Sequence, residues 1–310
     1  MNRLTFLAAL LAVCSGFSLA SADDDAQKAR AAEFERAKQR TAGQDYLLRY
    51  KFTAGETIRW NIVHLATVDT KIQGTTQVAK TRSESTKVWI VTSVDPEGHA
   101  TFVHRVADIN MWQKVTGRQE IRYDSTKDET PPAAYEQAAS MVGIPLATIT
   151  IDPTGEVLER VDKKKQFGFG GGQITVTFPD KPLKIGEQWT HNYDIPVRLE
   201  EGQMQRIKSR QVFRLEEVQD GVATIRLDTE VLTPLDNPKV KVQLVQKLSH
   251  GEVKFDIERG RVVQQQTDLD ETVLAFSGAD SAMSYLARFT EELLPDEPQT
   301  AAVPDDTQTE

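Results

Sequence analysis

The chain has 310 residues, with 37 lysines and arginines against 46 aspartates and glutamates, and a formal net charge of −9. An acidic field of this size opposes nucleic acid and anionic lipid surfaces, so we expect neither as a partner. The length is enough for two modest domains, each with an ordinary apolar core.

Residues 1–22 have the features of a signal peptide. Arg3 precedes an apolar run, 4–19, and small residues lead into three aspartates. The run is short for a membrane span, and small residues suit a cleavage site. The alternatives are an uncleaved anchor or lipoprotein processing at Cys14, where Val13 replaces the expected small residue. We expect an exported protein, periplasmic or secreted, with no transmembrane segment after cleavage.

Cleavage after Ala22 removes Cys14, the single cysteine. The mature chain then has no thiol for a disulfide, a nucleophile or a metal ligand. Residues 23–45 next predict a polar helix, because acidic residues begin it, alanines recur in it and Gly43 suits its end. Its weak apolar face indicates a lead-in segment without a site.

Strand patterns with turns between them begin at Tyr46. Alternation is clear at Ile58, Trp60 and Ile62, and the Pro-Gly pattern at 95–98 predicts a type I turn. Within this half, Pro131–Gly143 predicts one helix, since its apolar residues recur at spacings of three and four. We expect this helix to lie over one end of a sheet.

The glycine-rich join at 163–172 predicts a loop, and strand patterns resume after it. The expected strands are 174–178, 188–197, 205–218, 222–232, 240–251, 252–257 and 261–276. Residues 281–294 predict a helix. The acidic tail 295–310 lacks bulky apolar residues and is expected to be disordered.

Three landmarks occur twice in the same order. Lys51–His64 and Phe178–Tyr193 each carry a Gly-Glu pair and then a tryptophan-centred run; likewise 94–103 matches 218–227, and 151–157 matches 257–262. Such a repeat predicts two tandem β-rich units, 46–165 and 166–294. We expect a mainly β fold of antiparallel, curved, half-barrel-like sheets with one or two covering helices.

Histidine spacing offers no metal site. His99 and His104 are five apart on an expected strand, so their side chains point to opposite faces. An HExxH-type helix is absent from the sequence. We interpret the five histidines as surface or strand residues: His64, His99, His104, His191 and His250.

Other motifs fit structural roles better than chemical ones. Gly168–Gly172 precedes a strand pattern, whereas a phosphate loop requires a helix. Asp124–Asp128 lacks the glycine and glutamate of a calcium loop, and Ser277–Ser281 fits a turn and helix cap. Glu56 and Glu187 occupy equivalent repeat positions, which favours a turn role over a glycosidase pair. The remaining candidates are interpreted as sheet core (Trp60, Trp89, Trp112, Trp189) and solvated cations (Lys163–Lys165, Lys239, Lys241, Lys247).

The chain resembles an uncharacterised family of exported bacterial proteins, known only as a domain of unknown function. The resemblance covers nearly all of 46–276 and is carried by Tyr50–Glu56, Tyr123–Ser125, Asp152–Val157 and Pro182–Trp189. It implies an envelope or secreted location and brings no catalytic residue. A looser architectural likeness is to lipoprotein-carrier half-barrels, in which a curved sheet covered by helix encloses an acyl chain.

We therefore predict a non-catalytic exported interaction module whose partner is an unknown envelope protein, without cofactor or metal. A carrier of an apolar ligand in a half-barrel cavity is the alternative, although the strands show little of the one-sided apolar face that a lipid cavity needs. A hydrolase with a carboxylate pair is the third hypothesis.

Overall fold

The structure is a computed structural model that describes residues 28, 31–32, 34–37, 43–163, 174–199 and 203–296. The predicted signal peptide, most of the glycine-rich join and the tail beyond 296 lie outside the described residues. The described residues among 28–37 are helical, within the helix expected at 23–45.

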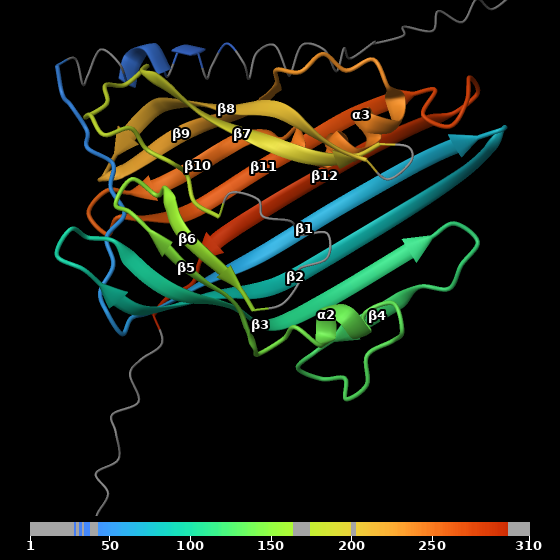
Figure 1. The fold of residues 1–310 in the computed structure, drawn as a ribbon, viewed down its shortest axis with the longest axis horizontal. Coiled ribbons are helices and arrows are strands. Elements are labelled where there is room, and N and C mark those ends of the chain that lie inside the picture. The colour runs from blue at the N-terminus through green and yellow to red at the C-terminus, as the bar shows by residue number, and fades with distance from the viewer. Residues whose placement is uncertain are drawn as a thin grey trace, which may run out of the picture.

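Twelve antiparallel strands form one open, strongly curved sheet (Figure 1). The mainly β, curved antiparallel class predicted from the sequence is confirmed. The strand order is β6-β5-β3-β2-β1-β12-β11-β10-β9-β8-β7, with β4 added beside β3. The bounds are β1 Thr57–Ile72, β2 Thr75–Val94, β3 Ala100–Val115, β4 Ile121–Asp124, β5 Pro145–Ile151, β6 Val157–Asp162, β7 Gln188–Arg198, β8 Met204–Gln219, β9 Val222–Val231, β10 His250–Asp256, β11 Arg261–Leu274 and β12 Ala282–Leu293.

The first and last strands meet in the middle of this sheet. β1 pairs with β12 in a continuous register from Trp60–Leu293 to Lys71–Ala282. Strands from the first expected repeat, β1 to β6, therefore lie on one side of this seam, and β7 to β12 lie on the other. The strands of both expected repeats belong to a single sheet.

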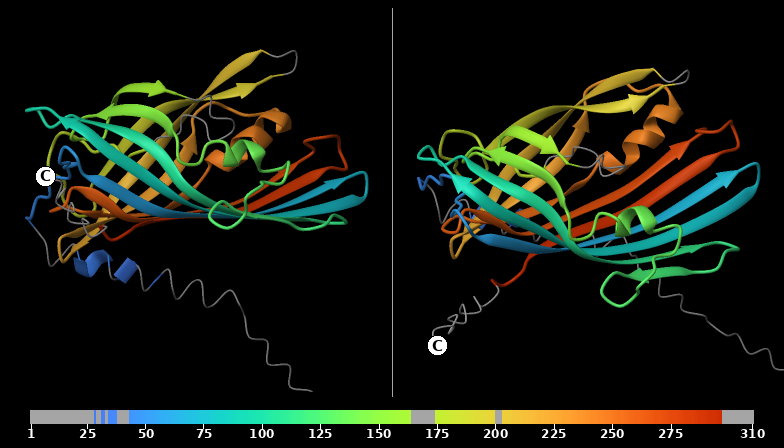
Figure 2. Two further views of the ribbon diagram at one scale, coloured as in Figure 1. Left: turned by 90° about the horizontal axis from the view of Figure 1, so that it is seen from below. Right: turned by 60° about the horizontal axis from the view of Figure 1, so that its bottom comes forward.

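Short helices lie inside the trough that the sheet forms (Figure 2). They are α2, Glu136–Ala139, from the first half, and α3, Pro238–Leu244, followed by the 3₁₀ turn η2, Val245–Lys247. Val240 and Leu244 of α3 are buried against β7 and β8, and Val245 packs with inward residues of β11 and β12. Each half thus contributes one helical segment over the concave face.

The helix predicted over 281–294 is wrong, because these residues form β12. Met283, Tyr285 and Ala287 are buried while Ser284 and Leu286 are exposed, which is the two-residue period of a strand. The apolar spacing that indicated a helix is also compatible with alternate strand positions. Pairing with β1 and β11 decides between the two.

The strand predicted over 240–251 is also wrong for its first part, which forms α3 and η2. Asn237 accepts a hydrogen bond from the Lys239 backbone N–H, and Pro238 occupies the first helical turn. The Asn-Pro pair was the missed signal. The helix predicted over 131–143 shortens to α2 within a series of turns, and the strand predicted over 174–178 is wrong, because these residues lie outside the strands.

The turn 152–155 joins the two halves at the closed end of the trough. Tyr50 donates its backbone N–H to Pro153, and Phe178 donates to Thr154, both at 2.8 Å. The Thr175 hydroxyl donates to the Gly155 carbonyl oxygen at 2.6 Å. This turn therefore anchors the chain before β1 and the chain after the join to the same point.

Candidate functional site

The trough contains a cavity of about 580 Å³, lined by residues of both halves and by both helical segments. Small-molecule sites commonly have volumes of about 300 to 1,000 Å³. Ala138 and Met141 from the α2 segment line it on one side, and Gln246 and Lys247 of η2 line it on the other. Its size and concave position make it the candidate site.

A β-bulge determines which side chains of β3 face this cavity. The pairing of β2 with β3 shifts between Ser85 and Lys87, so that inward positions on β3 change from even to odd numbers. Without this shift, strict alternation would turn one end of β3 outward. The inward residues of the two strands are Ser83, Ser85, Lys87 and Trp89 on β2, and His104, Val106, Ile109 and Met111 on β3.

The closed end of the cavity is aromatic. The rings of Trp60 and Trp89 lie 4.8 Å apart in an edge-to-face arrangement, and Trp89 stacks on Phe102 at 4.2 Å. Trp60 donates its indole N–H to the Val262 carbonyl oxygen at 2.9 Å, which satisfies its polar atom. Both tryptophans are nearly inaccessible, so they form the core as predicted and at the same time the cavity wall.

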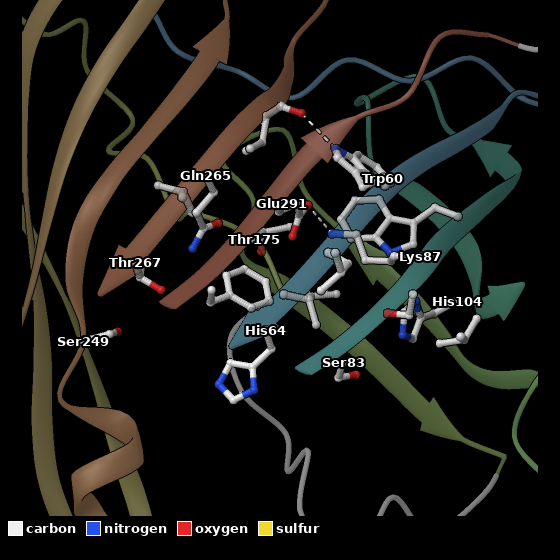
Figure 3. Close-up of a pocket in the computed structure, with 18 of the residues that line it drawn as sticks. Trp60, His64, Ser83, Lys87, His104, Thr175, Ser249, Gln265, Thr267 and Glu291 are labelled. Atoms are coloured by element: carbon white, nitrogen blue, oxygen red, sulfur yellow. Dashed lines mark hydrogen bonds and ion pairs between the residues drawn. The ribbon is translucent and has the colours of Figure 1, made fainter. Parts of the chain in front are cut away.

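Lys87 and Glu291 form a buried ion pair across the seam (Figure 3). Their side chains are 15% and 10% exposed. The Lys87 ammonium also lies 4.3 Å from the Trp60 ring centroid and 4.8 Å from that of Trp89. Cation–π attraction and the carboxylate together offset the loss of hydration around the ammonium.

His104 presents an unsatisfied polar atom at the cavity. Its Nδ1 is buried and has no hydrogen-bond partner among the described residues. Burial lowers the pKa of His104 to about 4, with further lowering by the charges of Lys87 and Arg160. The imidazole is therefore neutral at physiological pH, with one ring nitrogen available for hydrogen bonding. Gln211 likewise buries its Oε1 without a partner in the described part of the chain.

We expect His104 to make stability depend on pH. Its folded pKa of about 4 lies below the usual histidine pKa of 6.5, so the unfolded state binds more protons between these values. Stability is therefore full above pH 6.5 and falls as the pH drops toward 4, by about 2 kcal/mol at pH 5. Urea unfolding at pH 7.5 and pH 5 should show a smaller fall for His104→Gln. His99→Gln, which removes an exposed histidine bonded to Asp95, is the control; equal falls in both variants would contradict the assignment.

The other histidines are dispersed. His64 lines the cavity, and burial lowers its pKa. His99 bonds to Asp95 at 2.8 Å, and His191 lies 4.0 Å from Glu156. No group of three His, Cys, Asp or Glu side chains suited to a metal ion occurs in the part of the chain that the structure describes.

Glu56 and Glu187 perform the same turn role. Glu56 accepts a hydrogen bond from the Thr53 backbone N–H, and Glu187 accepts one from Lys184, each three residues earlier and at 2.8 Å. The hydrogen bond from the Lys184 backbone lowers the pKa of Glu187 most, and the hydrogen bond from the Lys181 side chain lowers it further. The repeated Gly-Glu pair thus closes an equivalent turn in both halves.

The two polar motifs considered for chemistry form local turns, and the helix cap predicted at Ser277–Ser281 is wrong because strand β12 follows it. Asp124 accepts bonds from Lys127 and Thr126, and these hydrogen bonds lower its pKa to about 2. The Ser281 hydroxyl accepts from the Ser277 N–H and donates to Gly278, both at 2.7 Å. The site residues that sequence reasoning missed, Lys87 and Glu291, carry no local motif.

Comparison with known proteins supports an uncharacterised domain. Residues 164–262, less than half of the chain, match a family of unknown function, DUF6263. A search of curated proteins found no match. No helix in the described part is long and apolar enough to cross a membrane.

Similar solved structures have low sequence identity. A lipovitellin structure concerned with lipid–protein interactions matches with 10% identity and a TM-score of 0.42, covering 82% of this chain and 26% of that one. DynF from the dynemicin pathway of Micromonospora chersina matches with 8% identity and a TM-score of 0.22, covering 81% of this chain and 90% of that one. A DUF1329 family protein from Desulfovibrio piger matches with 9% identity and a TM-score of 0.15, covering 90% of this chain and 94% of that one. This chain thus spans about a quarter of the lipovitellin chain, and TM-scores below 0.5 carry no functional information.

Proposed function

We propose that the protein binds an apolar small molecule, of lipid or acyl-chain type, in the trough and carries it outside the cytoplasm. The observation that carries this proposal is the cavity of about 580 Å³ with an aromatic closed end. The cavity thus favours the carrier hypothesis over the interaction module that the sequence alone favours. The extracytoplasmic location remains a proposal that rests on the predicted signal peptide.

The sequence shows little one-sided apolar surface because the inward positions are mixed. On β2 the inward residues run from Ser83 and Ser85 through Lys87 to Trp89, and on β3 His104 stands beside the inward aliphatic residues. The apolar part of the lining comes from strands that are distant in the sequence. Trp60 and Trp89 from the first half line the cavity together with Phe213 and Leu227 from the second half. The cavity is therefore a property of the whole curved sheet rather than of any single strand.

One observation favours an interaction module as the second candidate. β6 is an edge strand, and its Val157, Leu158 and Val161 are 37%, 52% and 42% exposed. An unpaired edge with exposed apolar side chains is suited to strand addition by a partner.

The hydrolase hypothesis needs two carboxylates in one cavity. Glu291 is the one carboxylate among the described cavity-lining residues, and it pairs with Lys87. A hydrolytic carboxylate pair therefore finds no support in this cavity.

Native mass spectrometry of the protein exported by its own host and purified without detergent tests the proposal. We expect an additional mass of a few hundred daltons that is lost on denaturation. A bare protein that also fails to bind any long-chain probe would overturn the carrier proposal and favour the module.

Filling the cavity should weaken ligand binding. Ser85 faces the trough between Ile62 and Ile109, so Ser85→Phe places a ring in the space for ligand. We expect at least about a tenfold loss of affinity for a fluorescent fatty-acid probe, since about 1.4 kcal/mol corresponds to that factor. Leu286→Phe, at an exposed position of β12, should bind normally. Equal binding by both variants would place the ligand elsewhere.

A further inference from the structure

We infer that the ligand carries an anionic head group, a carboxylate or a phosphate, and that this group is bound at the wall formed by His104, Lys87 and Arg160. The inference rests on the proposed function, because it defines the ligand for the same cavity.

Cations outnumber anions around the cavity, although the whole chain has a net charge of −9. The charged residues among the described lining are Lys87, Arg160, Lys247, Arg261 and Glu291. Three of the cations have carboxylate partners: Glu291, Asp162 and Glu56 respectively pair with Lys87, Arg160 and Arg261. Lys247 adds an exposed positive charge at η2. Even with these partners counted, the four cations and three carboxylates leave a positive net charge at the cavity, which complements an anionic ligand.

The positive charges converge on His104. Trp89, two residues after Lys87, pairs with His104 on β3, and Ala147 of β5 pairs with His104 on the other side. Arg160 of β6 pairs with Ile149, two residues from Ala147. Lys87 and Arg160 therefore flank His104 along neighbouring strands, and the lowered pKa of the imidazole reflects both charges in addition to burial. Figure 3 shows Glu291 on one side of Lys87 and His104 on the other.

A buried polar atom without a protein partner lies at the same place, among the described residues. A buried polar atom without a partner is destabilising, so native proteins seldom retain one without a ligand or a bound water. The Nδ1 of His104 is such an atom among the described residues. In the tautomer with a proton on Nδ1, it can donate one hydrogen bond to a carboxylate or phosphate oxygen. Lys87 and Arg160 then attract the anion by their positive charge, and the hydrogen bond from the neutral imidazole orients the head group.

Glu291 competes with the ligand head group for the Lys87 ammonium. Its carboxylate already pairs with Lys87, so an incoming anion shares the ammonium with it. Gln keeps the shape of Glu291 and removes its charge. Glu291→Gln should therefore bind the anionic ligand several-fold more tightly than the unmodified protein, because it removes a negative charge that repels the head group and occupies the Lys87 ammonium.

The test compares chain-matched probes with the full-length protein at pH 7.5: dodecanoate, dodecyl phosphate, methyl dodecanoate and dodecyltrimethylammonium. We expect both anions to bind at least about tenfold more tightly than the ester, and the ammonium to bind most weakly. Acetate and inorganic phosphate should not bind at matched concentration, which distinguishes an amphipathic ligand from a free anion. Equal or tighter binding of the ester or the ammonium overturns the head-group inference and leaves the carrier proposal intact. Failure of all four long-chain probes overturns both.

Variants locate the head group. Arg160→Gln changes a residue of an edge strand, and His104→Gln removes the imidazole; each should lower the ratio of dodecanoate to ester affinity by about fivefold or more without weakening ester binding. Lys80→Gln, which removes an exposed cation of β2 outside the cavity lining, is the control and should leave the ratio unchanged. If Lys247→Gln on η2 lowers the ratio and the changes at Arg160 and His104 do not, the His104 wall is the wrong location.

Discussion

Lys87→Met is expected to lower the free energy of unfolding by about 3 kcal/mol or more, because it leaves the Glu291 carboxylate buried without its partner. Glu291 is 10% exposed at the side chain, so water cannot replace the ammonium fully. Methionine retains most of the apolar stem of Lys87, so the loss reports the charge that lies over the Trp60 and Trp89 rings rather than a cavity. Urea unfolding at pH 7.5 measures it.

The double variant Lys87→Met with Glu291→Met should recover most of this loss, since replacing both members of a buried ion pair by apolar residues is often neutral. Lys80→Met, at an exposed position of the same strand, should change stability by less than about 0.5 kcal/mol. A double variant as unstable as Lys87→Met alone would show that the cost comes from lost packing. A cost below about 1 kcal/mol for the single change would show that water reaches the carboxylate.

Gly155→Ala should be comparably damaging, at about 3 kcal/mol. A Cβ atom at this position would lie 2.5 Å from Cε2 of Tyr50 and 2.6 Å from the Val176 carbonyl oxygen. The residue also has a φ of +89°, a conformation that favours glycine. Relief of the clash requires Tyr50 to move, which breaks the bond that its hydroxyl accepts from the Val176 N–H. Thermal or urea unfolding measures the loss.

Gly143→Ala provides the control for backbone strain alone. Gly143 has a φ of +77°, and a Cβ atom at this position would have no neighbour within 4 Å among the described residues. We expect a loss of about 1 kcal/mol there, from conformation without collision. The difference between the two variants then measures the close approach of 152–155 to Tyr50 and Val176. Equal losses would mean that the turn shifts freely and does not hold the two halves together.

The strands and turns that could be predicted from the sequence are those determined locally. The Pro-Gly patterns at 95–98 and 152–155 form the expected turns, with Gly98 and Gly155 each donating to the aspartate three residues earlier. Clear alternation at 222–227 indicated β9. Where apolar residues fit both periods, as at 281–294, the local pattern could not decide, and only pairing with β1 and β11 selects the strand.

The candidate site was beyond local prediction for the same reason. Lys87 and Glu291 are 204 residues apart in the chain, and the seam brings them together. The sequence did contain one signal, since Lys87 shares a strand face with Trp89. A lysine on the same face as a core tryptophan indicates a buried cation that needs a counter-charge. Its partner was hidden because Glu291 lies in the stretch interpreted as a helix.

The seam between β1 and β12 also governs the order in which the protein can mature. β1 spans Thr57–Ile72, and its partner on the C-terminal side begins only at Ala282. Until the ribosome has released Leu293, one long edge of β1 stays unpaired and open to aggregation. Contacts across such a sequence separation also make folding slow. The trough, and any cargo it holds, can therefore be assembled only after β12 has been synthesised.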